Sequence, residues 1–279
     1  MQAPVALLTI SEWIYAIVMA IVQGATEFIP VSSSGHMAII SYIAHVPEPI
    51  DFIFFLHIPS LIAAVIYFRE DIRDFTLSWL PKNAEEMAPQ RRVTIFLVVA
   101  MLVTGPIGLA FSGRLDEFST SLLVLGAMFI VTALMLVSSE YMLARAELTR
   151  SMDKLTPARA AIIGLVQGLA VIPGISRSGS TIAAGLWVGL SRPQAARFSF
   201  LLSIPVVIAG SLRDIVRLFQ GDLVLPSFWI SAVSFVIAGV VSYLVIAWMI
   251  RLVSKTNLNW FAVYATLLGI VLIVLHFAG

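Results

Sequence analysis

The stretch QGATEFIPVSSSGH, Gln23–His36, places a carboxylate, three consecutive serines and a histidine inside a strongly apolar chain. When the chain is shifted by 144 residues, this stretch lies without a gap over QGLAVIPGISRSGS, Gln167–Ser180. The glutamine, both glycines of the first stretch and two of its serines coincide with the second. Self-similarity at a fixed offset is the signature of a duplicated unit, so we predict two copies of one unit in this chain.

A second pair of blocks follows in the same order. FFLHIPSLIAA, which begins at Phe54, lies over FLLSIPVVIAG, which begins at Phe200, at an offset of 146 residues. Two blocks at nearly one offset are unlikely to arise by chance, because each match is independent of the other. We therefore predict unit one over residues 10–138 and unit two over residues 156–278, within a single membrane domain.

The composition of the chain is that of a membrane protein. Hydrophobic residues make up 59% and charged residues 12% of the 279 positions, whereas a soluble domain has roughly 45–50% and about 25%. The excess lies in runs close to the ~20 residues that a helix needs to span a bilayer. Four runs are clear: Val93–Phe111, Ser119–Ser138, Phe228–Ile250 and Trp260–Ala278. An all-α integral membrane protein is predicted, since the strands of a barrel would alternate in polarity.

Composition also excludes several classes of function. The chain has no cysteine, which rules out disulfides, thiolate chemistry and a cysteine zinc site. The net charge of +1 gives no electrostatic support to a nucleic-acid partner. The apolar run Met1–Ile21 lacks a basic segment and a small-residue cleavage site, so we interpret it as part of the mature protein.

Each unit is predicted to begin with a re-entrant helix hairpin. An apolar helix runs into the polar stretch, and a short helix leaves it, over His36–Val46 in unit one and Thr181–Ser191 in unit two. The short helices cannot span a bilayer. Three spanning helices then follow in each unit, the first of them at Phe52–Phe68 and Phe198–Leu212. Three crossings are an odd number, so the two units are expected to have inverted topology.

The distribution of basic residues predicts which side faces the cytoplasm. Thirteen of the seventeen Lys and Arg residues fall in loops assigned to one side, three fall on the other, and Arg177 lies within the second polar stretch. The positive-inside rule makes the side with thirteen cytoplasmic. We therefore expect a multi-pass protein of the plasma membrane with both termini outside.

The two polar stretches are predicted to form an anion site. Each places serines and a glycine directly before a short helix, where several backbone N–H groups have no partner within the helix. Two helix N-termini that meet inside a membrane attract anions. Arg177 adds a cation whose planar fork suits phosphate oxygens. Phosphate is the natural ligand candidate.

The first stretch adds groups suited to acid–base chemistry. Gln23 and Glu27 are four residues apart and share one helix face. Glu27 beside a phosphate is expected to act as acid or base or to hold a divalent cation. His36 lies three residues beyond Ser33 and is placed to act as base or proton donor to it. His57, near the Ile-Pro of the second block, is a candidate supporting residue.

Structural interpretations stay open beside these functional ones. Serines in membrane helices often bond only to backbone carbonyls, and Gln23 is matched by Gln167 in the other unit, which suggests packing. A purely structural ion pair between Glu27 and Arg177 is the alternative for those two residues. Because a charge inside a membrane is costly, we interpret both as functional.

The two polar stretches resemble the two signature motifs of the undecaprenyl-pyrophosphate phosphatase family, also called bacitracin-resistance proteins. The first motif reads Glu or Gln, three residues, Glu, then Pro-Val-Ser-Ser and Gly-His, and QGATEFIPVSSSGH contains it in full. The second reads Pro-Gly-x-Ser-Arg-Ser-x-x-Thr and matches PGISRSGST. The resemblance extends over essentially the whole chain, including FSFLLSIP at Phe198–Pro205.

The resemblance implies an activity and a set of site residues. It implies hydrolysis of undecaprenyl diphosphate to the monophosphate and inorganic phosphate, which recycles the lipid carrier of cell-wall glycans and confers bacitracin resistance. Glu27 falls on the acid, base or metal-ligand position, Ser33 on the nucleophile, and His36 on its base or proton donor. Arg177 falls on the diphosphate clamp. The implied substrate-binding residues are Gln23, Ser32, Ser34, Ser176, Ser178 and Thr181.

The resemblance also implies a divalent cation, Mg²⁺ or Ca²⁺. Gln23 stands where many bacterial members have a second glutamate, so one charge that could bind the cation is missing here; the cation could instead arrive with the diphosphate. The alternative function is a flippase or transporter for a polyprenyl phosphate, which the inverted repeat suits equally. A carrier would not need the set of Ser33, His36 and Glu27. The oligomeric state is not determined, and a homodimer stays open.

Overall fold

The computed structural model describes residues 10–46, 50–80, 85–111, 118, 121–145, 150–220 and 224–278. Over these residues the protein is helical, which confirms the predicted all-α class, and its only pairing of strand type is an isolated bridge between Arg150 and Leu190. The elements are α1 (Ile10–Thr26), α2 (Ser33–Ala44), α3 (Ile50–Tyr67), α4 (Arg69–Leu77), α5 (Ala88–Phe111), α7 (Leu122–Ala144), η3 (Met152–Lys154), α8 (Pro157–Leu169), α9 (Arg177–Trp187), α10 (Arg192–Gln220), α11 (Phe228–Val253) and α12 (Asn259–Ala278).

The short helices of the two hairpins begin earlier than predicted. We expected starts at His36 and Thr181, but α2 begins at Ser33 and α9 at Arg177. The cause is side-chain capping: the Ser32 hydroxyl accepts a hydrogen bond from a backbone N–H at 3.3 Å, and the Ser176 hydroxyl does so at 3.0 Å. Ser33 and Arg177 are therefore the first residues of their helices.

The charged segment after α3 is helical in its first part. Arg69–Leu77 forms helix α4, bent by 65° from α3. Glu70 and Asp71 lie in its first turn, where carboxylates stabilise the positive end of a helix. Similarly, α10 is longer than the predicted Phe198–Leu212, because it includes the polar segment that begins at Arg192.

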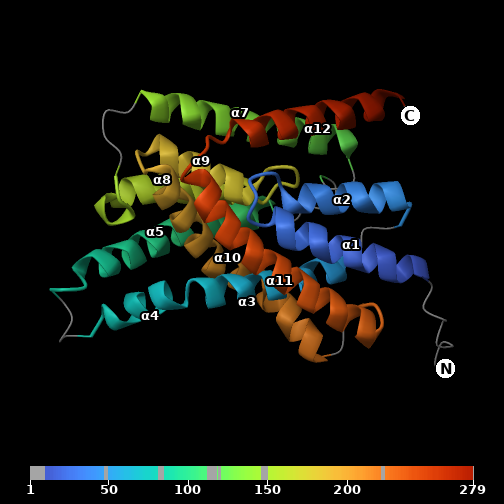
Figure 1. The fold of residues 1–279 in the computed structure, drawn as a ribbon, viewed down its shortest axis with the longest axis horizontal. Coiled ribbons are helices and arrows are strands. Elements are labelled where there is room, and N and C mark those ends of the chain that lie inside the picture. Colours follow the sequence, from blue (N-terminus) through green and yellow to red (C-terminus); the bar gives the residue numbers. More distant parts are fainter. Residues whose placement is uncertain are drawn as a thin grey trace.

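Four of the described helices, α5, α7, α11 and α12, are long and apolar enough to cross a membrane, and the bent pair α3–α4 makes five if it counts as one span. The protein is thus a multi-pass membrane protein, while the sixth crossing, within α10, remains a prediction. The beginning of α1 and the end of α12 lie at the same end of the molecule, on the right in Figure 1.

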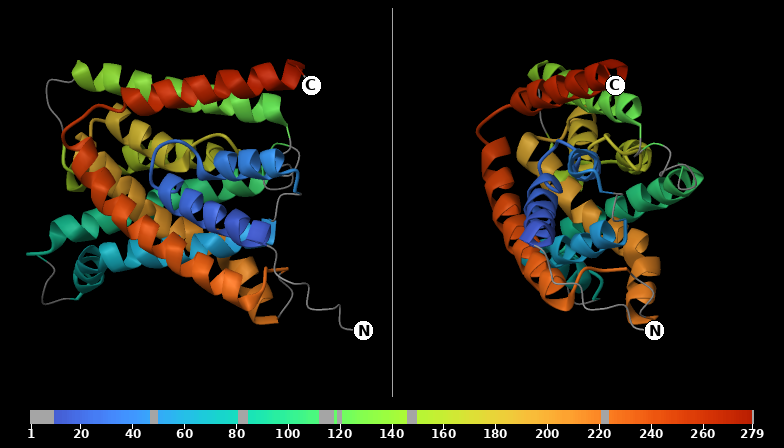
Figure 2. Two further views of the ribbon diagram at one scale, coloured as in Figure 1. Left: turned by 45° about the vertical axis from the view of Figure 1, so that its right-hand side comes forward. Right: turned by 90° about the vertical axis from the view of Figure 1, so that its right-hand side faces the viewer.

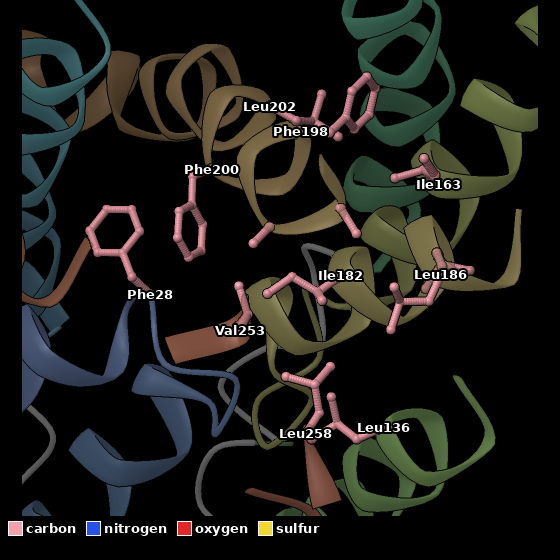
Figure 3. Packing of buried hydrophobic residues seen from close by; sticks show 14 of the residues in the cluster. Phe28, Leu136, Ile163, Ile182, Leu186, Phe198, Phe200, Leu202, Val253 and Leu258 are labelled. Atoms are coloured by element: carbon pink, nitrogen blue, oxygen red, sulfur yellow. The ribbon is translucent and has the colours of Figure 1, made fainter. Parts of the chain in front are cut away.

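Helix α9 forms the centre of the bundle. Its residues from Ser178 to Leu186 are buried, and it packs against α7, α8 and α10. Figure 3 shows Ile182 and Leu186 of this helix among side chains from the surrounding elements. At the edge of the same cluster Phe28 meets Phe200 edge to face, with ring centroids 5.3 Å apart. The second hairpin is therefore enclosed by other elements of the protein.

Helices α7 and α12 pack side by side along one edge of the bundle, as both views in Figure 2 show. They touch at Gly126 and Gly269. A Cβ atom on either glycine would lie 2.7 Å from the carbonyl oxygen of the other. Only glycine permits so close a contact between two backbones, and such contacts are typical of helix pairs in membranes.

Ion pairs connect the helices near their ends. Arg217 of α10 donates to Asp51 of α3 at 2.8 Å, and Nε of Arg197 donates to Asp71 of α4 at 3.2 Å. A third pair joins Arg192 to Glu140 of α7, whose carboxylate also accepts from the backbone N–H of Leu258 at 2.9 Å. This last cluster ties α7 to the beginnings of α10 and α12.

Candidate active site

The two polar stretches meet, as predicted, and the contact includes the ion pair between Glu27 and Arg177 that the sequence left open as an alternative. We call the segment 27–35 the first tip and the segment 171–179 the second tip. The guanidinium of Arg177, at the start of α9, donates to Oε1 of Glu27, in the turn after α1. The side chains are 5% exposed for Glu27 and 17% for Arg177. A buried charge needs a partner because desolvation is expensive, and here the partner comes from the other unit.

The second carboxylate oxygen of Glu27 is also occupied. The hydroxyl of Ser33 donates to Oε2 at 2.7 Å, and the side-chain amide of Gln23 donates to it at 3.0 Å. Nε2 of His57, on α3, lies 3.6 Å from the same oxygen. A serine hydroxyl bound directly to a carboxylate is the geometry of a nucleophile beside its base. Gln23, Glu27, Ser33 and Arg177 thus form one cluster.

His36 lies near this cluster but makes other contacts. Its Nδ1 is 2.7 Å from the carbonyl oxygen of Ser32, and its Nε2 is 2.6 Å from the hydroxyl of Tyr264 on α12. Both ring nitrogens are therefore engaged by groups other than Ser33. The group that can take a proton from Ser33 in this arrangement is Glu27.

The remaining predicted residues build the tips with their hydroxyl groups. Ser178 donates to the carbonyl of Ile29 at 3.0 Å and so joins the two tips, while Thr181 donates to the carbonyl of Arg177 at 2.8 Å. The hydroxyl oxygens of Ser32 and Ser34 lie 3.4 Å apart. For Ser178 this is the structural role that the sequence left open.

The sequence did not indicate two residues that support the tips. Thr132 of α7 accepts a hydrogen bond from the backbone N–H of Ser176 at 3.0 Å and donates to the carbonyl of Gly174 at 3.2 Å. Tyr264 contacts His36 across 228 residues of sequence. Neither lies in a motif or at a helical spacing from one, so spacing alone could not have found them.

Residues 16–271 match the family described as bacitracin resistance protein BacA. The chain belongs to this family. Three curated relatives are each named undecaprenyl-diphosphatase. The protein from Mycolicibacterium smegmatis is 36% identical over 273 residues, which cover 96% of this chain and 98% of the relative. The Bacteroides fragilis protein is 36% identical over 94% and 98%, and the Methanosphaera stadtmanae protein is 36% identical over 93% and 96%.

The tips of this BacA-family chain do not fit a divalent cation held by side chains. In the described part of the chain, no group of three or more His, Cys, Asp or Glu could hold a metal. Glu27 is the one carboxylate at the tips, and Arg177, Ser33 and Gln23 already bind its two oxygens. Oε1 of Gln23 is buried without a partner, but so is Oε1 of Gln167, so this atom does not indicate a cation.

An apolar groove of about 460 Å³ lies apart from the polar cluster. None of Glu27, Ser33, His36 and Arg177 lines it. Its walls come from α3, from α11 and from the segment before α11. The lining residues are Phe55, Leu225, Pro226, Phe228, Ser231, Ala232, Phe235 and Val236.

Proposed function

We propose that this protein hydrolyses undecaprenyl diphosphate to undecaprenyl monophosphate and inorganic phosphate, and so recycles a lipid carrier of cell-wall synthesis. The observation that carries the proposal is Glu27, which bridges Ser33 of the first tip and Arg177 of the second. It brings together a nucleophile, a base and an anion-binding group inside a membrane protein. The name shared by the three relatives supports the same reaction.

The chemistry follows from these three side chains. Oγ of Ser33 attacks the terminal phosphorus, and its proton passes to Oε2 of Glu27, 2.7 Å away. The bond from that phosphorus to the bridging oxygen breaks, and the monophosphate leaves with the proton from Glu27. Water then attacks the phosphoserine and gives its proton to Glu27. The bond from phosphorus to Oγ of Ser33 breaks, inorganic phosphate leaves, and Glu27 returns the proton to Ser33. Arg177 and the backbone N–H groups at the starts of α2 and α9 stabilise the charge on the phosphoryl oxygens.

Substrate binding also activates the base in this scheme. Arg177 neutralises Glu27 before substrate arrives. A diphosphate competes for the guanidinium, because bidentate binding of phosphate oxygens is its preferred interaction. When Arg177 turns to the phosphate, Glu27 loses its counter-ion and becomes a stronger proton acceptor.

The alternative function, a carrier for a polyprenyl phosphate, would not need the contact between Ser33 and Glu27.

The test is phosphate release from undecaprenyl diphosphate by the purified protein. Ser33→Ala, Glu27→Gln and Arg177→Lys should each lower kcat by about a hundredfold or more, since each removes a nucleophile, a base or a charge-stabilising fork. Ser254→Ala, at the exposed end of α11, is the control. Near-full activity of Ser33→Ala would replace the covalent route by direct attack of water. A wild type that releases no phosphate but moves lipid phosphate across vesicles would favour the carrier.

The Mg²⁺ or Ca²⁺ expected from the resemblance is proposed to enter with the diphosphate as its counter-ion. A phosphate-bound cation that keeps several waters needs few protein ligands. The steps assigned above to Ser33, Glu27 and Arg177 do not depend on it.

The inverted arrangement of the two units is part of the proposal, and the ion pairs at the ends of α3–α4 and α10 support it. Asp51 and Arg197 are related by the 146-residue offset, and so are Asp71 and Arg217. Exchanging the units therefore converts the pair Asp51–Arg217 into the pair Arg197–Asp71. The two aspartates lie near opposite ends of α3–α4, and the two arginines lie near opposite ends of α10. This exchange is expected when a two-fold axis relates two inverted units.

The contact between α7 and α12 supports the same relation. Gly126 and Gly269 are 143 residues apart, close to the offsets of the two blocks, and each meets the carbonyl oxygen of the other at the same distance. A reciprocal contact between matched residues is expected where a two-fold axis passes between two units.

We further propose that the protein lies in the plasma membrane with both termini outside.

A further inference from the structure

Hydrogen bonds determine the tautomer of His36. A carbonyl oxygen can only accept, so Nδ1, 2.7 Å from the Ser32 carbonyl, carries the proton. In the neutral ring Nε2 is then an acceptor, and the hydroxyl of Tyr264, 2.6 Å away, donates to it. Tyr264 therefore holds the ring in the form that can donate to Ser32.

Aromatic contacts also fix the orientation of this ring. The rings of His36 and Tyr264 are stacked with centroids 5.7 Å apart and an angle of 7° between their planes. Phe129 of α7 meets the imidazole edge to face at 5.5 Å. With both nitrogens bonded and two aromatic neighbours, the imidazole has one orientation, set by α7 and α12.

The group to which His36 donates has an unusual backbone. Ser32 has φ 69° and ψ 98°, in a sparsely populated region that is strained for a residue other than glycine. The matched residue of unit two, Ser176, caps its helix in the same way but has φ −74°. Capping alone therefore does not require the positive φ. Unit two has Ser180 where unit one has His36, so the carbonyl of Ser176 accepts from the backbone N–H of Ser180 at 2.8 Å and not from an imidazole.

We propose that Tyr264, acting through His36, is a positioning residue that keeps Ser32 in its left-handed conformation and thereby presents Ser33 to Glu27. The carbonyl of Ser32 accepts from both the ring Nδ1 and the backbone N–H of His36. Ser33 follows directly and reaches Glu27 at 2.7 Å. The inference rests on the proposed function, in which Ser33 is the nucleophile.

The place of Tyr264 on α12 makes this support rigid. Gly269, five residues further along the helix, is in backbone contact with α7. Ala265, next to Tyr264, is fully buried. The contact between Gly269 and α7 thus fixes the position of the Tyr264 hydroxyl relative to Phe129. Phe129 lies on α7 beside this contact.

Tyr264→Phe tests the inference, because it keeps the stacked ring and removes only the donor. We expect kcat for phosphate release to fall about tenfold, the effect of one well-placed hydrogen bond, with KM changed by less than about twofold. The control is Tyr141→Phe on α7, a tyrosine that is 55% exposed, which should behave as wild type. A Tyr264→Phe enzyme within about twofold of wild-type kcat would overturn the proposal.

A second comparison separates positioning from general stability. Ser32→Gly and Ser32→Ala both remove the cap hydroxyl, but only glycine takes a positive φ without cost. Adding Tyr264→Phe should cost about tenfold in kcat in the Ser32→Ala background and less than about twofold in the Ser32→Gly background. Equal losses in the two backgrounds contradict the proposed route through Ser32.

A spectroscopic measurement remains if a Ser32 variant does not fold. In ¹⁵N-histidine-labelled wild-type protein, His36 should show a protonated Nδ1 and a hydrogen-bonded, unprotonated Nε2. Tyr264→Phe should shift the Nε2 resonance, and an unchanged resonance would overturn the contact. This measurement needs no turnover, so it distinguishes failure of the inference from failure of the proposed phosphatase activity.

Discussion

At the scale of single residues, the site depends on one carboxylate with several partners. Glu27 has Arg177 on one oxygen and Ser33 and Gln23 on the other. The matched residue of unit two is Val171, and the residue matched to Arg177 is Ser33. The two polar stretches therefore contribute different groups: the first provides the carboxylate and the serine hydroxyl bound to it, and the second provides the guanidinium.

Gln23→Glu should create a site in which side chains bind a divalent cation. It would place a second carboxylate at hydrogen-bond distance from Glu27, beside the guanidinium of Arg177. We expect a lower Tm in detergent than the wild type, and an increase in Tm with added Mg²⁺, because a ligand that binds only the folded state stabilises it.

Gln167→Glu is the matched control for that experiment. Its amide donates to Thr104, 3.0 Å away, and not to a carboxylate. Added Mg²⁺ should leave its Tm unchanged. If Mg²⁺ raised the Tm of the wild type as well, a cation site made of side chains would exist despite Gln23.

At the scale of helices, close backbone contacts and buried clusters hold the hairpins in place. Helix α9 is enclosed by its neighbours, and α7 touches α12 directly at two glycines. Both helices of this pair also contribute to the site: α7 carries Phe129 and Thr132, and α12 carries Tyr264. A shift of α7 would therefore change both tips, and a shift of α12 would change the first.

Gly126→Ala should destabilise the protein by about 1–3 kcal/mol, as expected for overpacking at a backbone contact that cannot relax. The measurement is the free energy of unfolding in detergent. Gly108→Ala on α5 is the control, since no atom lies within 4 Å of its Cβ position. It should be neutral, or stabilising by up to about 1 kcal/mol through helix propensity. Similar effects of both substitutions would mean that the contact between α7 and α12 is not tight.

Sequence periodicity and repetition predicted the elements that depend on local pattern. These two patterns predicted the apolar runs of α5, α7, α11 and α12 and the two hairpins. They also placed Glu27 close to Arg177. What they missed depends on three-dimensional packing or on side-chain capping. The helix starts at Ser33 and Arg177 follow from serine caps. The contact of Tyr264 with His36 has no periodic signal, because it depends on how α12 crosses α7.

At the scale of the whole molecule, the described helices form one bundle in which elements of the two units alternate. Helix α1 packs against α11, and the corresponding α8 packs against α5. The first helix of each hairpin thus lies against a long apolar helix of the other predicted unit.

The proposed orientation can be tested with single cysteines, since the wild type has none. Val224→Cys, at a position 81% exposed before α11, should react with a membrane-impermeant thiol reagent in intact cells. Ser254→Cys, at the opposite end of α11, should react only after permeabilisation, because the basic residues beside it predict a cytoplasmic location. The reverse labelling pattern would place both termini in the cytoplasm.

The contact between Tyr264 and His36 also has a consequence for biosynthesis. Every motif residue has been synthesised once Thr181 is added, but Tyr264 and Gly269 belong to α12, the last of the described helices. The tip that carries Ser33 is therefore completed only after α12 has been synthesised. A nascent or truncated chain that lacks α12 contains the entire motif set and yet has no partner for His36.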